Sequence, residues 1–188
     1  MNYRHGYHAG NFADVVKHAV LALLLQALRR KEKPCCYLET HAGAGRYDLR
    51  SESAQKTGEY RQGIERLWNH ADLHPLLDGY LAAVRAVNAE HARDGAPALR
   101  YYPGSPWIAR VLLGPRDRMV LMELHPEQAQ RLKTGFAEDR RAHVHPEDGY
   151  LGLKAFLPPA ERRGLVLLDP PFEDPQEFER LARGLLDA

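Results

Sequence analysis

Four short apolar runs, separated by segments of helical character, most constrain how this 188-residue chain can fold. The runs cover residues 35–40, 119–124, 142–145 and 164–168. Strands that alternate with helices predict an α/β fold built on a parallel, doubly wound, twisted sheet with flanking helices. The run at 164–168 has no polar interruption, which is typical of a strand buried on both faces of such a sheet.

A wide apolar stripe predicts the first helix, which we expect to begin at about Phe12 behind an Asn11 N-cap. The stripe, expected to be buried, consists of Phe12, Val15, Val16, Ala19, Val20, Leu23, Leu24, Ala27 and Leu28. Residues 1–11 before it are polar and aromatic and predict a loop or arm. A final helix over 175–186 is amphipathic in the same way. Its inward face is expected to consist of Phe178, Leu181 and Leu185.

A helical section is expected to interrupt the α/β core. The predicted organisation is 1–50 for the arm, first helix and first strand, 51–97 for a small inserted helical subdomain, and 98–188 for the rest of the core. Within that last part, 101–106 predicts a rigid loop, because it contains two prolines and a glycine. A short helix is expected at 107–113.

Composition places the chain among soluble globular proteins, with 44% hydrophobic and 27% charged residues. The net charge of +1 weakens a non-specific DNA-binding function but leaves room for a local basic face. The adjacent Cys35 and Cys36 make a poor disulfide and are expected to be reduced strand residues. The histidines lack the spacing of a metal site, so no metal is expected. The apolar segment 19–28 is too short to cross a bilayer, and we predict a cytoplasmic protein with no membrane contact.

Each predicted strand is followed by a group that suits a ligand, and in an open α/β sheet these groups share one edge. They are Gly43 and Gly45, Glu123, Asp148, and Asp169. The turn over 41–45 lacks the lysine of a phosphate loop. Glu123 could accept both ribose hydroxyls of an adenosine, or be a solvated strand-end carboxylate. Asp148 could accept from an adenine amine, or simply begin an Asp-Gly turn.

The stretch Asp169-Pro170-Pro171-Phe172 suits the exocyclic amino group of a flat base. The carboxylate of Asp169 and the carbonyl of Pro170 can accept hydrogen bonds, and the prolines supply no competing N–H. Phe172 offers a ring for stacking. The alternative is an acidic turn that caps a strand, with Pro-Pro starting a helix. Beside an adenosine site, the stretch favours a methyl donor over a nicotinamide, and Asp169 would receive the amine proton directly or through water.

As a set, these motifs resemble the RlmJ family, which are 23S ribosomal RNA adenine-N6 methyltransferases of the class I, S-adenosylmethionine-dependent type. The resemblance covers the whole chain. The stretches that carry it are Tyr3-Arg4-His5, His8-Ala9-Gly10-Asn11, Asp14 through His18, Thr40 through Tyr47, Thr57-Gly58-Glu59-Tyr60, Arg100 through Pro106, Glu123-Leu124-His125-Pro126, Asp148-Gly149 and Asp169-Pro170-Pro171.

The resemblance implies a Rossmann-like methyltransferase fold and a set of residue roles. The implied S-adenosylmethionine contacts are His18, His41, Ser105, Glu123, Asp148, Gly149 and Asp169. Asp169 is also implied as the catalytic acceptor, and Tyr3 as a contact to the RNA, with Arg4, His5 and Lys17 bordering the target adenine. The resemblance further implies a monomer that acts alone on protein-free 23S RNA, with the inserted subdomain helping to bind it.

Two departures from the family pattern qualify these expectations. Phe172 stands where a tyrosine is common, so stacking is kept and a hydroxyl contact is lost. The chain ends at Ala188, where the family continues through further strands. We therefore expect C-terminal strands to be missing. Either the 188 residues are a fragment of a longer gene product, or a partner covers the apolar edge at 164–168. A monodisperse, monomeric and fully active 188-residue chain would contradict this.

Two other functions stay open on the sequence. A DNA adenine-N6 methyltransferase shares the Asp-Pro-Pro-aromatic site, and composition does not separate RNA from DNA. A non-catalytic protein for nucleic-acid binding or DNA utilisation is the second alternative. It predicts that replacing Asp169 leaves function intact.

Overall fold

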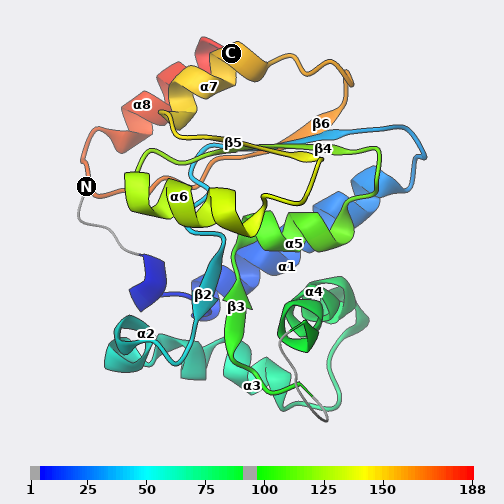
Figure 1. The fold of residues 1–188 in the computed structure, drawn as a ribbon, viewed down its shortest axis with the longest axis vertical. Coiled ribbons are helices and arrows are strands. Elements are labelled where there is room, and N and C mark those ends of the chain that lie inside the picture. Colours follow the sequence, from blue (N-terminus) through cyan, green and yellow to red (C-terminus); the bar gives the residue numbers. More distant parts are fainter. Residues whose placement is uncertain (1–4, 91–96) are drawn as a thin grey trace. The chain divides into compact units, whose positions relative to one another are not determined.

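The computed structural model describes residues 5–90 and 97–188 (Figure 1). The chain divides into two compact units, which we describe one at a time. The sheet unit contains Lys31–Ala44 and Gly114–Ala188. The helical unit contains residues 5–30 and Gly45–Leu113.

A parallel four-stranded sheet forms the centre of the sheet unit, which confirms the predicted α/β class. Its strands are β1 Cys36–Glu39, β4 Arg118–Met122, β5 Ala142–His145 and β6 Gly164–Leu167. The order is β5-β4-β1-β6. Glu39 lies opposite both Leu121 and Leu167, and Met122 lies opposite His145. The carboxyl ends of the strands therefore meet at one edge of the sheet.

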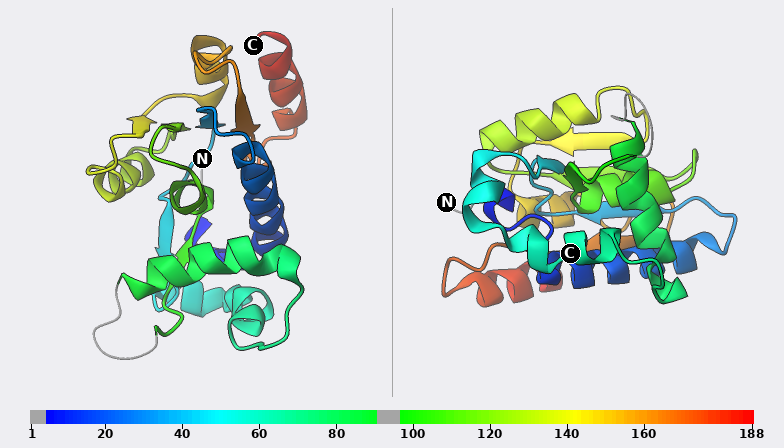
Figure 2. Two further views of the ribbon diagram at one scale, coloured as in Figure 1. Left: turned by 90° about the vertical axis from the view of Figure 1, so that its right-hand side faces the viewer. Right: turned by 90° about the horizontal axis from the view of Figure 1, so that it is seen from below.

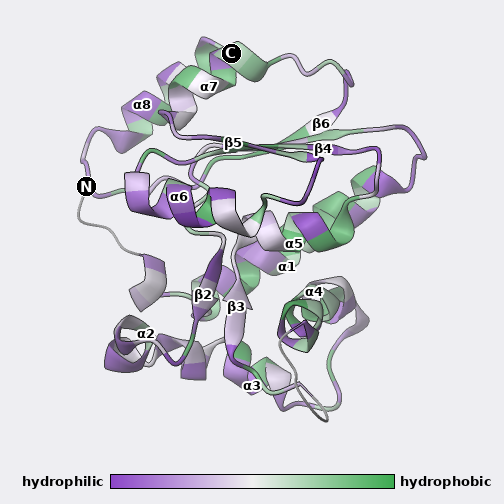
Figure 3. Ribbon diagram, in the orientation of Figure 1, coloured by the Kyte–Doolittle hydropathy of each residue, from purple (hydrophilic) through white to green (hydrophobic). Residues whose placement is uncertain are grey.

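Helices lie on both faces of this sheet (Figure 2). On one face, α7 Gly149–Phe156 packs its Leu153 into a buried cluster with side chains of β1 and β4. The buried members of that cluster are Cys36, Leu38, Val120, Met122 and Leu153. On the other face lies α6 Pro126–Gly135, which is mostly hydrophilic (Figure 3) and buries Ala129 and Leu132. The two cysteines are buried and are not joined by a disulfide.

The predicted double burial of the strand at 164–168 is wrong. No residue of β6 is fully buried, since β6 is the edge of the sheet and pairs only with β1 among the described residues. The expected inward face of the last helix, α8 Glu177–Leu186, is also wrong. Phe178 and Leu185 are 71% and 52% exposed, and the helix instead buries Glu177 and Gly184 against the sheet unit.

The helical unit contains the arm, the first helix and the inserted section. Its helices are α1 Phe12–Arg29, α2 Glu52–Thr57, α3 Ile64–Trp68, α4 Asp78–Ala89 and α5 Ser105–Leu112, with short 3-10 turns at His5–Tyr7, Glu59–Gln62 and Pro75–Leu77. The strands β2 Arg46–Asp48 and β3 Tyr101–Pro103 pair antiparallel. The prediction of a loop at 101–106 is therefore wrong except at Gly104. Tyr102 pairs with Tyr47 far away in the sequence, and α5 already begins at Ser105.

Helix α1 begins behind its Asn11 cap as predicted, because Asn11 Oδ1 accepts from the N–H of Asp14 at 2.9 Å. Apolar residues run along much of its length (Figure 3). The predicted stripe is nevertheless only partly buried: Ala19 is buried, and Val15, Leu23 and Leu28 are half-buried. The side chains at Phe12, Val16, Val20 and Leu24 are 48–70% exposed. The buried residues are Asp14, His18, Ala19, Leu21, Ala22 and Leu25. None of the helices in the described part of the chain is long and apolar enough to cross a membrane.

Candidate active site

The edge of the sheet is held together by backbone hydrogen bonds beyond the strands. The N–H of Thr40 donates to the carbonyl oxygen of Leu167 at 3.2 Å, and the N–H of Ala42 donates to the carbonyl oxygen of Met122 at 2.9 Å. After Thr40 the chain turns sharply through Gly43, whose φ of 62° is left-handed. Glycine adopts that conformation without steric cost, so the turn can stay close to the strand ends.

Glu123 follows β4 and is nearly buried at this edge, with 5% exposure. Its Oε2 accepts from the N–H of Gly43 at 2.8 Å, and its Oε1 accepts from the N–H of His125 at 2.7 Å. Each carboxylate oxygen has a second lone pair. Glu123 is therefore fixed in place and can still accept hydroxyl donors from a ligand.

Asp148 and Gly149 begin helix α7 beside the end of β1. Asp148 Oδ1 caps the helix by accepting from the N–H of Tyr150 at 2.8 Å. A Cβ at Gly149 would lie 2.2 Å from the carbonyl oxygen of Thr40, so only glycine permits this approach. The Asp-Gly turn expected as an alternative is thus present, and it brings the Asp148 carboxylate to the same edge as Glu123.

His41 lies in a polar and aromatic environment that sequence reasoning did not foresee. Its Nδ1 is 2.8 Å from the hydroxyl of Thr40, and its ring meets the ring of Tyr150 edge-on at 5.4 Å. Burial lowers the pKa of His41, although the carboxylates of Glu177, Asp148 and Asp169 oppose this shift. The imidazole is therefore favoured in its neutral form.

Tyr150 links α7 to α8. Its hydroxyl donates to Glu177 Oε1 at 2.7 Å, and the guanidinium of Arg180 lies 5.3 Å from the ring centroid. Burial, reinforced by the hydrogen bond to Glu177, raises the pKa of Tyr150. Sequence reasoning missed this pair, because a glutamate on a surface helix is ordinarily solvated.

The stretch 169–172 follows β6 at the open side of the sheet. Asp169 is half-buried and Pro170 is buried. Phe172 has a left-handed φ of 51°, is 45% exposed, and packs its ring 4.8 Å from the ring of Phe178. A left-handed bulky residue is strained, and such strain is concentrated at functional sites. The prolines do not start a helix, since α8 begins at Glu177.

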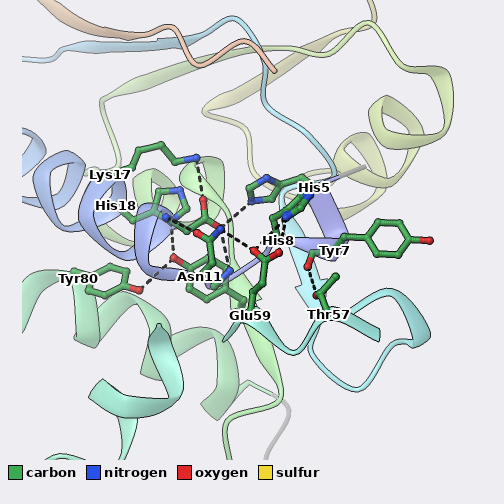
Figure 4. Close-up of polar contacts among 12 residues, drawn as sticks. His5, Tyr7, His8, Asn11, Lys17, His18, Thr57, Glu59 and Tyr80 are labelled. Atoms are coloured by element: carbon green, nitrogen blue, oxygen red, sulfur yellow. Dashed lines mark hydrogen bonds and ion pairs between the residues drawn. The ribbon is translucent and has the colours of Figure 1, made fainter. Parts of the chain in front are cut away.

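In the helical unit, His18 is completely buried on α1 (Figure 4). Its Nδ1 lies 2.8 Å from the hydroxyl of Tyr102, which lies 3.2 Å from the hydroxyl of Tyr80. Its Nε2 is buried and has no hydrogen-bond partner in the described part of the chain. Burial lowers the pKa of His18 to about 3, so the ring is neutral. Ser105, the first residue of α5, is buried next to Gly104, whose N–H donates to Gly45 at 2.7 Å.

Asp14 anchors the arm beside His18. The carboxylate accepts from the N–H of Gly10 at 2.9 Å and from His5 Nε2 at 2.8 Å, and it pairs with Lys17 Nζ at 3.0 Å. Burial opposes ionisation, but the hydrogen bond from His5 and the positive charges nearby lower the pKa of Asp14 well below its usual range. Lys17 and His5, expected near a target base, are thus both held by Asp14.

A second contact ties the arm to the inserted section (Figure 4). Glu59 accepts from His8 Nδ1 at 2.9 Å and from Asn11 Nδ2 at 3.0 Å. The hydroxyl of Thr57 donates to the carbonyl of Tyr7. Sequence reasoning did not foresee these partners. The predicted RNA contact Tyr3 and its neighbour Arg4 lie outside the described residues.

Three arginines and two aromatic rings alternate on β2, β3 and α5; we call this set the arginine–aromatic stack. Its members are Arg100, Tyr101, Arg46, Trp107 and Arg110. The guanidinium of Arg46 lies 4.7 Å from the ring centroid of Tyr101 and 5.1 Å from that of Trp107. Arg110 covers Trp107 at 4.5 Å, and Arg100 covers Tyr101 at 4.8 Å. Stacked guanidinium groups of this kind are suited to phosphate recognition.

The structure thus brings five of the predicted site residues to one edge of the sheet unit, and His18 and Ser105 to the helical unit. The five are His41, Glu123, Asp148, Gly149 and Asp169. The family model described as "Ribosomal RNA large subunit methyltransferase D, RlmJ" matches residues 32–188. The chain belongs to this family. The resemblance read from the motifs is therefore confirmed.

Two curated relatives bear the name "Ribosomal RNA large subunit methyltransferase J". The protein of Escherichia coli strain K12 is 49% identical over 187 residues, and that of Haemophilus influenzae is 45% identical over 185 residues. The chain spans 65% and 64% of the lengths of these RlmJ relatives. A crystal structure of a protein from Legionella pneumophila is also similar, with 38% identity and a TM-score of 0.85. That match covers 96% of this chain and 64% of the other.

Proposed function

We propose that this RlmJ-family chain takes part in the S-adenosylmethionine-dependent methylation of N6 of an adenine in 23S ribosomal RNA. The names of the relatives support ribosomal RNA methylation as the reaction class. The observation that carries the finer proposal is the shared sheet edge, where Glu123, Asp148 and Asp169 follow neighbouring parallel strands. We further propose that the protein acts in the cytoplasm, as a monomer, on protein-free RNA.

The residues present fit an adenosyl ligand. Glu123 is held by two backbone N–H groups and retains lone pairs for two hydroxyl donors, and Gly149, which has no Cβ, lets the start of α7 lie directly against the Thr40 carbonyl. In the helical unit, the buried Nε2 of His18 lacks a partner among the described residues and so suits a polar ligand atom. When bound, S-adenosylmethionine would supply a methyl group on a positively charged sulfur.

Asp169 and Pro170 would handle the acceptor amine. The carboxylate of Asp169 and the carbonyl of Pro170 accept hydrogen bonds from N6, which orients its lone pair for attack. When the methyl group passes to N6 and its bond to sulfur breaks, Asp169 would receive the proton that N6 gives up, directly or through one water. Phe172 is half-exposed beside these groups and would stack on the base.

The arginine–aromatic stack supports a nucleic-acid substrate. The rings of Tyr101 and Trp107 hold guanidinium groups in fixed planes, although Arg100 shares its charge with Asp48 at 3.0 Å. Arginine in such a position binds phosphate through two parallel hydrogen bonds. This surface gives a near-neutral chain a local basic face.

The test compares methyl transfer by the purified protein and by Asp169→Asn. Transcribed 23S RNA is incubated with S-adenosylmethionine, digested, and analysed for N6-methyladenosine by mass spectrometry. Loss of proton acceptance and positioning should lower turnover by about 10²–10⁴-fold. Binding of S-adenosylmethionine, measured by calorimetry, should weaken only in part.

Asp187→Asn is the matched control, because Asp187 is exposed just after α8 in the same unit. It should transfer methyl groups like the unaltered protein. If Asp169→Asn keeps its turnover, the assignment of Asp169 fails and a non-catalytic nucleic-acid-binding function gains support. If only DNA of the same sequence is methylated, the RNA substrate is wrong.

A further inference from the structure

Tyr80, Tyr102 and His18 form a buried series of hydrogen bonds (Figure 4). One ring nitrogen of this series, His18 Nε2, has no partner among the described residues. All three side chains are 0% exposed. Tyr80 belongs to the inserted section and Tyr102 to β3, so these hydrogen bonds connect distant segments to α1. Buried polar groups without partners are costly, which makes the direction of each hydrogen bond decidable by counting.

In one arrangement the protons run toward His18. Tyr80 donates to Tyr102, and Tyr102 donates to Nδ1 of His18. A neutral imidazole carries one proton, which must then reside on Nε2. Every hydroxyl proton has an acceptor, and the N–H at Nε2 is the one donor left over among these groups.

In the opposite arrangement the protons run away from His18. The N–H at Nδ1 donates to Tyr102, and Tyr102 donates to Tyr80. The hydroxyl proton of Tyr80 then has no acceptor in the described part of the chain, and Nε2 is an unpaired acceptor as well. This arrangement leaves two buried polar groups without a hydrogen-bond partner, whereas the first leaves one. Each such group costs about 1–3 kcal/mol.

We infer that Tyr80 and Tyr102 are positioning residues that hold His18 as the Nε2–H tautomer, so that His18 donates a hydrogen bond to an acceptor oxygen of the ligand. This inference rests on the proposed function. Of the acceptor groups on S-adenosylmethionine, the carboxylate of its amino-acid end is the only ionised one and makes the strongest hydrogen bonds. Glu123, which can only accept, suits the ribose hydroxyls.

The tautomer is tested first, without ligand or RNA. The protein is labelled with ¹⁵N-histidine, and long-range ¹H–¹⁵N correlation spectra report which ring nitrogen carries the proton. The His18 signal is identified by its loss in His18→Gln. We expect a protonated Nε2 in the unaltered protein and loss of this preference in Tyr102→Phe. A proton on Nδ1 in the unaltered protein would overturn the inference.

The ligand group is tested by calorimetry with two probes. S-adenosylhomocysteine carries the amino-acid carboxylate, and 5′-methylthioadenosine lacks it. Tyr102→Phe should weaken binding of the first by about tenfold or more, as expected for a hydrogen bond to a charged group, and leave the second within about twofold. Equal losses for both probes, or no loss, would overturn the assignment of the carboxylate.

Tyr80→Phe keeps the inference testable if Tyr102→Phe does not fold. It removes the end of the series, so it should weaken S-adenosylhomocysteine in the same direction but by less than Tyr102→Phe. Tyr60→Phe, a change in the same unit outside this series, is the control and should bind both probes normally. A protein that binds both probes as expected but transfers no methyl group would fail the proposed function alone, and an Nδ1–H tautomer in an active enzyme would fail this inference alone.

Discussion

Asp14 lies in the first turn of α1 and Asp169 lies just after β6, and the surroundings of the two carboxylates are opposite in kind. Asp14 is 3% exposed and is surrounded by the donors of Gly10, His5 and Lys17. Asp169 is half-buried after the edge strand β6, next to a strained Phe172. The first site is built for stability, because its charge is fully compensated. The second site leaves its carboxylate partly accessible, beside a backbone conformation that is strained.

Replacing Asp14 should have the largest effect on stability. Asp14→Asn keeps the shape but removes the charge that pairs with His5 and Lys17, and leaves those donors poorly satisfied. The free energy of unfolding in urea should fall by about 3–5 kcal/mol, the usual cost of breaking a buried ion pair. Asp169→Asn should change the free energy of unfolding by less than about 1 kcal/mol. Equal losses of stability for the two substitutions would contradict the view that Asp14, and not Asp169, contributes mainly to stability.

Acid should destabilise the protein through the buried His18 and Asp14. The folded pKa of His18 is lowered to about 3 from 6.5, so the unfolded chain binds a proton that the folded chain refuses between these values. Stability is complete above pH 6.5 and falls as the pH drops toward 3, with a slope from this one group of up to about 1.4 kcal/mol per pH unit. Asp14, whose folded pKa is also lowered, adds a loss of the same sign below its usual value of 3.8.

Urea titrations at pH 7, 6 and 5 measure this slope. In His18→Gln the slope should be smaller than in the unaltered protein, whatever the absolute stability of the variant. A slope that survives in His18→Gln would mean that other histidines carry the acid sensitivity.

The smallest effect concerns strain at Phe172. Phe172→Gly and Phe172→Ala both remove the ring that packs on Phe178, but only glycine adopts a φ of 51° freely. The glycine variant should therefore be more stable than the alanine variant by about 1 kcal/mol. In an ordinary backbone conformation the order is the reverse. Thermal or urea unfolding of the pair gives the sign, and an alanine variant that is the more stable would show that the backbone there is not strained.

Local patterns predicted much of the architecture. The strands at 119–124, 142–145 and 164–168 lie within about two residues of β4, β5 and β6, since short apolar runs and their turns are properties of neighbouring residues. The candidate groups after those strands were also foreseeable, because parallel strands bring their carboxyl ends to one edge.

Periodicity failed where a helix has more than one apolar face. On α1 the stripe at Phe12, Val16, Val20 and Leu24 is more hydrophobic than the face that is buried. The buried face includes Asp14 and His18, whose burial is tolerable only because Gly10, His5 and Tyr102 satisfy them. Tyr102 comes from a distant part of the chain, and Gly10 and His5 reach Asp14 only through the conformation of the arm, so apolar periodicity does not indicate these partners. The same holds for Glu177, which α8 buries against Tyr150.

The amino-acid sequence by itself thus determined the parallel sheet, the order of its motifs and the chemistry available at its edge. These follow from side-chain type, spacing and the handedness of strand connections. Only the tertiary structure decided which face of α1 is buried, that β2 pairs with β3, and that Tyr102, itself bonded to Tyr80, reaches His18. The physical reason is that a hydrogen bond between residues 18 and 102 depends on packing many segments at once, and the sequence records such a contact in no single place.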